Sequence, residues 1–157
     1  MAARDKSPPQ RGALDLRAIE TVLGYTLRRA QALETALYAD TVGRSGVRPV
    51  QFTLLLLIRD NPGVRAIDLA RVLDIRRANM VALIQELETQ GWVVRRADAR
   101  DGRAQSLHLA PAGTRRLKRL EQDHQVHQQQ LLERMGAQDL ARLVGLLQKL
   151  VRPAGRA

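Results

Sequence analysis

Residues 67–109 constrain the fold more than any other part of the chain. A short helix is predicted at Ile67–Leu73, and a second one from about Arg76 to Gln90. The apolar positions of the second segment recur at helical spacing: Met80, Leu83, Ile84 and Leu87. Gly91 can end that helix in a left-handed conformation. The order short helix, turn, second helix predicts a helix-turn-helix.

A β-hairpin is predicted directly after these helices. The apolar runs Trp92–Arg96 and Ala104–Leu109 flank a charged stretch that contains Asp101 and Gly102, and Asp-Gly is a strong hairpin signal. A basic hairpin behind the second helix of a helix-turn-helix indicates a DNA-binding wing.

Long helices are predicted on both sides of this region. One helix is expected from Leu14 to about Val42, and Pro49 is placed to open a nearly all-apolar helix that continues over Gln51–Arg59. After the hairpin, Pro111 opens a helix that is expected to reach about Met135, and Gln138–Val151 forms a last one.

The last predicted helix carries an apolar stripe that a free terminal helix would expose. Its members are Leu140, Leu143, Val144, Leu147, Leu150 and Val151. A second copy of the chain could cover this stripe, or the outer helices could pack on each other within one chain.

Charge and composition limit the partners of the chain. Its 157 residues hold 26 Lys and Arg against 16 Asp and Glu, a net charge of +10, which favours polyanions such as nucleic acid. The absence of cysteine excludes disulfides, thiol-based sensing and cysteine-bound zinc. No apolar run approaches the roughly 20 residues of a membrane span, so we expect a cytoplasmic protein without a membrane partner.

The ordered set of motifs resembles the MarR family of bacterial transcriptional regulators. The resemblance covers about Leu16 to Val151, and its most specific parts are Leu69 to Leu73, Leu87 to Val93, Asp98 to Arg103 and Ala110 to Gly113. Membership implies a homodimer that binds two half-sites of a pseudo-palindromic operator, about one DNA turn apart, and usually releases DNA when a small molecule binds.

The predicted fold class is therefore mainly α with a small β-hairpin wing. A winged helix-turn-helix domain is expected over residues 46–110. A helical dimerisation platform is expected from residues 14–45 and 111–152, and residues 1–13 are predicted to form a disordered basic tail.

The helical period of the second helix identifies candidate DNA contacts. If its apolar positions face the core, the opposite face and its flanks carry Arg76, Arg77, Asn79, Val81, Ala82 and Gln85. Arg can bind guanine, Asn and Gln can pair with adenine, and small apolar groups can touch thymine methyls. For Arg77, base reading and phosphate contact both remain open.

The hairpin supplies the remaining DNA candidates. Arg103 fits the family pattern of a minor-groove finger, and Asp101 beside it could orient the guanidinium. Four other arginines are expected to bind phosphates: Arg65, Arg95, Arg96 and Arg100. The alternative is that the hairpin charges serve solubility alone.

Effector-binding candidates come from the resemblance, because family pockets lie between the dimer platform and the winged domain. They are Tyr25, Arg28, Arg29, Phe52 and Leu56. Family effectors include phenolic carboxylates, antibiotics and aryl thioesters, and a basic pocket would suit an anion. The alternative for Tyr25 and Phe52 is a place in the core.

Neither catalysis nor a cofactor is expected, since no phosphate loop, activated nucleophile or carboxylate pair is visible. His124 and His127 could share one helix face and bind zinc with Glu121 or Asp123, or they could be two solvated histidines.

Two other functions remain open. An architectural protein would bind DNA through charge alone, without a preferred site. A protein-interaction module would use the same fold for a protein partner.

Overall fold

The computed structural model describes residues 14–97 and 105–152 of the chain. The chain divides into two compact units, residues 1–36 and 37–157, and each is described by itself. Within the described residues, no helix is both long and apolar enough to cross a membrane.

The first unit contains α1 (Arg17–Glu20) and most of α2 (Leu23–Asp40). The prediction of one unbroken helix from residue 14 to 42 was wrong, because the helix is interrupted at Thr21 and Val22. The Thr21 hydroxyl donates to the Ala18 carbonyl at 2.8 Å. Thr21 and Val22 are both β-branched, and two such neighbours form helix poorly. The Thr26 hydroxyl donates to the Glu20 carbonyl that the break leaves open.

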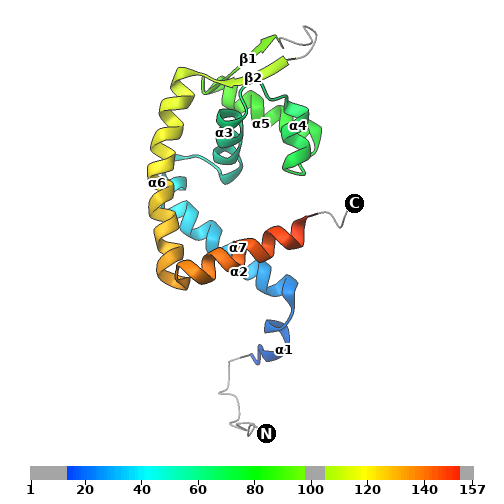
Figure 1. Cartoon of the computed structure of the whole chain (residues 1–157), viewed down its shortest axis with the longest axis vertical. Helices are drawn as coiled ribbons and strands as arrows, with labels where there is room; N and C mark the ends of the chain where they lie inside the picture. The colour runs from blue at the N-terminus through cyan, green and yellow to red at the C-terminus, as the bar shows by residue number, and fades with distance from the viewer. Residues whose placement is uncertain (1–13, 98–104, 153–157) are drawn as a thin grey trace, which may run out of the picture. The chain divides into compact units, whose positions relative to one another are not determined.

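The second unit is a helical body with one hairpin (Figure 1). After the end of α2, its elements are η1 (Val42–Ser45), α3 (Pro49–Asp60), α4 (Ala66–Val72), α5 (Arg77–Thr89), β1 (Val93–Ala97), β2 (Gln105–Leu109), α6 (Pro111–Met135) and α7 (Ala137–Val151). These elements confirm the predicted mainly α fold with a small hairpin. The helix predicted from Pro111 has the bounds expected of it.

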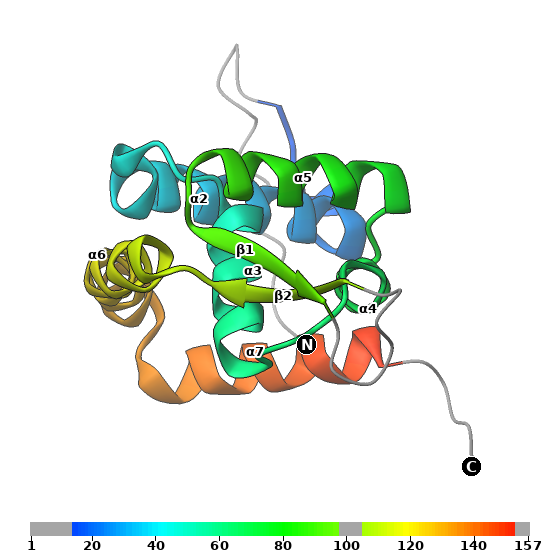
Figure 2. The ribbon, with the colours of Figure 1, turned by 90° about the horizontal axis from the view of Figure 1, so that it is seen from above.

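The core of this unit forms around α3. Pro49 occupies the first turn, where its missing N–H costs nothing, and the Gln51 side chain accepts a bond from the Arg48 N–H at 3.0 Å. The side chains of Leu54, Leu55 and Ile58 are fully buried. Seen from above, the hairpin crosses α3 (Figure 2), and β2 packs on it.

A third backbone segment pairs with the middle of β2. β1 and β2 pair antiparallel with Val93 opposite Leu109 and Ala97 opposite Gln105. On the other edge of β2, Leu107 exchanges backbone bonds with Val64 and Gly63, each at 2.9 Å. The β2 strand is therefore paired on both edges at Leu107.

Both helices of the helix-turn-helix end in the same backbone motif. After α5, Gly91 at φ 69° donates its N–H to Glu88, and the N–H of Trp92 bonds the Leu87 carbonyl. After α4, Asp74 takes the left-handed position at φ 50°, and Ile75 donates its N–H to Ala70 at 2.9 Å. These turns fix the angles at which the chain leaves α4 and α5.

The start of α6 lies against the root of the hairpin. The Ala110 N–H donates to the Trp92 carbonyl at 2.9 Å, and Arg116 stacks on the Trp92 ring. A Cβ at Gly113 would lie 1.9 Å from the Trp92 carbonyl oxygen, so glycine is required there. This contact explains why glycine stands at position 113, one of the residues on which the family resemblance rests.

Candidate nucleic-acid interface

The α5 helix buries one face and exposes the other. Met80, Ile84 and Leu87 are buried, while Leu83 is half-buried. The candidate DNA-contacting residues of this helix are all exposed: Arg76, Arg77, Asn79, Val81, Ala82 and Gln85. Val81 is 44% exposed although it is apolar, so packing within the chain does not account for it. The predicted orientation of the helix is confirmed.

The Glu86 carboxylate joins α5 to the start of α3. It accepts a bond from the Arg48 guanidinium and another from the Gln51 side-chain amide, at 3.2 Å. Gln51 is itself buried, and its other amide atom caps α3. The α5 helix is thus tied to α3 by side-chain bonds.

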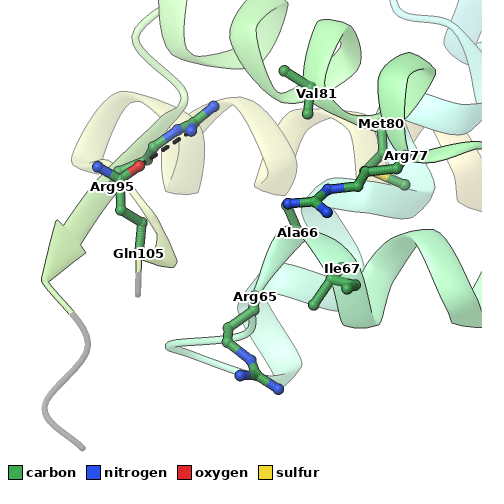
Figure 3. A pocket seen from close by; sticks show the side chains of 8 residues that line it. All are labelled: Arg65, Ala66, Ile67, Arg77, Met80, Val81, Arg95 and Gln105. Atoms are coloured by element: carbon green, nitrogen blue, oxygen red, sulfur yellow. Dashed lines mark hydrogen bonds between the residues drawn. The ribbon is translucent and has the colours of Figure 1, made fainter. Parts of the chain in front are cut away.

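A pocket of about 300 Å³ separates α5, the start of α4 and the hairpin. Its lining residues are Arg65, Ala66, Ile67, Arg77, Met80, Val81, Arg95 and Gln105. In Figure 3, Arg77 reaches from α5 toward Ala66, while Arg95 and Gln105 line the opposite side. Three of the predicted DNA-binding arginines therefore lie around one concave surface.

The three arginines of this pocket differ in their partners. Arg65 is bound by Asp68 at 3.1 Å, and Arg95 is bound by Glu88 at 2.9 Å. Among the described residues, Arg77 has no carboxylate partner. Its charge is available to an incoming polyanion, since no carboxylate of the described residues has to be displaced first.

The other predicted hairpin residues have different positions. Arg96 is exposed on β1, and its neighbour Arg95 points to the opposite face because side chains alternate along a strand. Arg100, Asp101 and Arg103 lie outside the described residues, and so does the Asp-Gly turn.

The effector candidates belong to separate units. In the first unit, Arg29 stacks on Tyr25, with 5.8 Å between its guanidinium carbon and the ring centre, and Arg28 is exposed. In the second unit, Phe52 is buried and Leu56 half-buried. The Phe52 ring packs on His124 at 5.1 Å, which favours the core alternative for this residue.

The two histidines are not a solvated pair, which was one of the two alternatives that the sequence left open. His127 is only 2% exposed and packs edge-on against Tyr38, and the His124 and His127 rings are 5.6 Å apart. Within the described part of the chain, no three His, Cys, Asp or Glu side chains are grouped in a way that could hold a metal ion.

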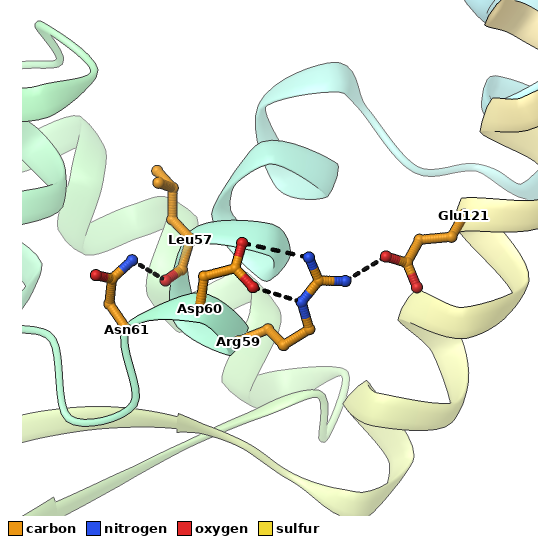
Figure 4. A network of polar contacts seen from close by, with 5 residues as sticks. All are labelled: Leu57, Arg59, Asp60, Asn61 and Glu121. Carbon is orange, nitrogen blue, oxygen red and sulfur yellow. Dashed lines mark hydrogen bonds and ion pairs between the residues drawn. The ribbon is translucent and has the colours of Figure 1, made fainter.

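A polar network ties the end of α3 to α6 (Figure 4). Arg59 donates to Asp60 at 2.7 Å and also to Glu121, and these bonds raise the pKa of Arg59 above its usual value. The same guanidinium holds the pKa of Asp60 below its ordinary range. The Glu121 carboxylate, which the sequence suggested as a possible zinc ligand, is therefore bound to an arginine.

Sequence reasoning missed the carboxylates that hold the interface together. Glu86 and Glu88 read as ordinary surface positions of an amphipathic helix, and their partners lie on other elements. A partial signal was present for Gln51, because Gln at the third position of a helix that opens with proline is typical of a capping interaction.

The fold and the exposed face of α5 define a winged helix-turn-helix protein of the DNA-binding class. The sequence profile of the MarR family matches residues 45–104. A curated relative from Thauera aromatica, a putative transcriptional regulatory protein for the hcr operon, is 34% identical over 131 residues, which are 83% of this chain and 79% of the relative. The chain belongs to the MarR family, and it is a DNA-binding transcriptional regulator and not an enzyme.

Solved structures of the transcriptional repressor CouR share this fold. CouR bound to a 23-mer DNA duplex is 31% identical, with a TM-score of 0.85, and CouR bound to p-coumaroyl-CoA is 29% identical, with a TM-score of 0.80. Each comparison covers 90% of this chain and 100% of the CouR chain.

Proposed function

We propose that this protein is a homodimeric repressor that binds a pseudo-palindromic operator and leaves it when a small molecule binds. The exposed outer face of α5 carries the proposal, because Arg77, Val81 and Gln85 present a cation, a methyl group and an amide on the surface opposite the buried one. These are the groups that read bases in the major groove. The structure of CouR bound to a DNA duplex, at 31% identity, supports DNA binding by this chain.

The apolar face of α7 supports the homodimer. Leu143, Val144, Leu150 and Val151 are exposed in the single chain, while Leu140 and Leu147 are half-buried. A stripe of this size in contact with water favours association, and closed twofold pairing is the commonest solution. The dimer would use residues 14–45 and 111–152, leaving residues 46–110 to the DNA.

Within the interface, the structure supports different parts for the candidate residues. Arg77 and Gln85 would contact base edges or phosphates from α5, and Arg65 and Arg96 would bind phosphates on either side. Arg103 would enter the adjacent minor groove, with Asp101 beside it to orient the guanidinium, as the family pattern implies.

For the effector we propose an aryl thioester of coenzyme A. The p-coumaroyl-CoA complex of CouR supports this class, and so does the net charge of +10, which attracts the phosphates of such a ligand. Binding can release DNA only if the effector prefers the conformation that DNA does not select.

A competition titration tests the repressor proposal. The protein is titrated with the promoter DNA of its own gene and neighbouring genes, against random DNA of equal length at near-physiological salt. A preference of about a thousandfold for one fragment is expected. Equal binding to all fragments would favour an architectural role, and no binding would favour a protein partner.

The effector is tested on the operator complex that this titration identifies. p-Coumaroyl-CoA is expected to dissociate the complex, whereas p-coumarate and coenzyme A alone leave it intact at the same concentrations. Equal affinity of the thioester for the operator-bound and the unbound dimer would contradict its role as an effector.

A further inference from the structure

The Glu88–Arg95 pair joins α5 to the hairpin. Glu88 lies in the last turn of α5 and Arg95 lies at the middle of β1. The Arg95 Nε–H is shared between the two carboxylate oxygens, at 2.9 and 3.0 Å. This side-chain bond spans the turn at Gly91, which backbone hydrogen bonds also hold.

Arg95 extends this connection to the second strand. Its Nη1 donates to the Gln105 side-chain oxygen at 3.1 Å. Leu107 is the direct partner of Arg95 in the register, so Gln105 is a diagonal neighbour on the same face of the hairpin. One guanidinium therefore links α5, β1 and β2.

The pair is better shielded than other ion pairs of the described chain. The side chains of Arg95 and Glu88 are 34% and 28% exposed, whereas those of Arg71 and Asp68 are 75% and 34% exposed. Salt screens a half-buried pair less than an exposed one. The Glu88–Arg95 pair can therefore fix the position of the Arg95 side chain more firmly than an exposed ion pair would.

We infer that Glu88 is a positioning residue for DNA recognition: by holding Arg95, it sets the direction of the hairpin relative to α5, so that both elements meet one half-site. This inference rests on the proposed function of these elements. A misplaced wing would weaken operator binding more than binding to random DNA, because only the operator complex requires both elements in register.

The positioning role and simple electrostatics predict opposite changes in operator affinity when the Glu88 carboxylate is removed. Removing a carboxylate beside the DNA raises the affinity for any DNA through charge alone. Loss of the positioning bond lowers operator affinity instead. For Glu88→Ala we expect operator affinity to fall about fivefold, the order expected for a shielded charge pair, with random-DNA affinity unchanged or raised.

Asp68→Asn is the matched control. Asp68 also binds an arginine of the same pocket, but its partners Arg65 and Arg71 belong to α4 and its N-cap, so the bond joins no second element. This variant removes one negative charge near the same surface. It is expected to keep the ratio of operator to random-DNA affinity.

Glu88→Gln separates the bond from the charge. The amide oxygen can still accept the Arg95 Nε–H, so this variant should recover part of the affinity ratio that Glu88→Ala loses. Alanine is a strong helix former, and unchanged urea midpoints would show that each variant is folded. A ratio as low in Glu88→Gln as in Glu88→Ala would overturn the bonding argument.

The competition titration then gives distinct outcomes. An unchanged ratio in Glu88→Ala, with wild-type protein still selecting the operator, overturns the positioning role alone. A wild-type protein without operator preference refutes the proposed function, and the inference falls with it.

Discussion

Replacing Gly113 with alanine should destabilise the protein through a single backbone clash. The added Cβ would lie 1.9 Å from the Trp92 carbonyl oxygen, and ordinary contact begins at 3.4 Å, so the two must separate by 1.5 Å. The Ala110 N–H bonds that same oxygen at 2.9 Å and holds the start of α6 in place. The clash cannot be relieved by rotating a side chain, because backbone atoms form it.

The expected loss is about 2–4 kcal/mol in the free energy of unfolding, from overpacking together with one weakened backbone hydrogen bond. For a chain of this length, that corresponds to a fall of about 5–15 °C in Tm. Urea and thermal unfolding, followed by circular dichroism, measure both quantities.

Gly145→Ala is the matched control, because Gly145 lies within α7 and a Cβ there meets nothing within 4 Å. The control should match or exceed wild type, since alanine is favoured over glycine in a helix by about 1 kcal/mol. Gly24→Ala in α2 provides a second open position. A loss below about 0.5 kcal/mol in Gly113→Ala, the range of ordinary surface substitutions, would refute the reasoning.

Three further predictions concern charge, backbone and pH. Arg77→Ala should lower operator affinity about tenfold and, if Arg77 binds a phosphate, reduce the salt slope by about 0.9. Binding assays at several salt concentrations measure both effects, and Arg134→Ala, in the last turn of α6, is the control. An unchanged affinity in Arg77→Ala would exclude a contact. Asp74→Val should cost about 1–2 kcal/mol in urea unfolding, because a β-branched residue is strained at φ 50°, whereas Asp74→Gly should be tolerated. The pKa of Asp60 is lower in the folded protein than in the unfolded chain, where it is about 4. The bond from Arg59 to Asp60 therefore stabilises the fold fully above about pH 4, and this stabilisation is lost as the pH falls through the pKa of the folded state. The loss of stability on acidification should therefore be less steep in Asp60→Asn, and equal slopes would contradict this.

The elements with strong local signals could be predicted from the sequence. Pro111 marks the start of α6 and Gly91 the end of α5, because each has a backbone preference that acts on its own. The exposed face of α5 followed from the spacing of Met80, Ile84 and Leu87, since a helix with one buried face must expose the other.

Features that depend on distant partners could not be predicted in the same way. The break at Thr21 depends on a side-chain bond that competes with the helix, and apolar spacing does not report it. His127 looks polar in sequence, yet it is buried because Tyr38 packs against it. Glu86 and Glu88 look alike in the sequence, although one is bound to α3 and the other to the hairpin.

The double-edged pairing of β2 has a mechanical consequence. Leu107 faces Arg95 of β1 on one edge and bonds the backbone of Gly63 and Val64 on the other, and its side chain is buried. Strand β2 is therefore held from both edges at Leu107, and the Ala97–Gln105 pair lies two positions beyond it along the hairpin. A force applied at the Ala97–Gln105 pair would therefore be passed through Leu107 to α3 and α6, against which β2 packs.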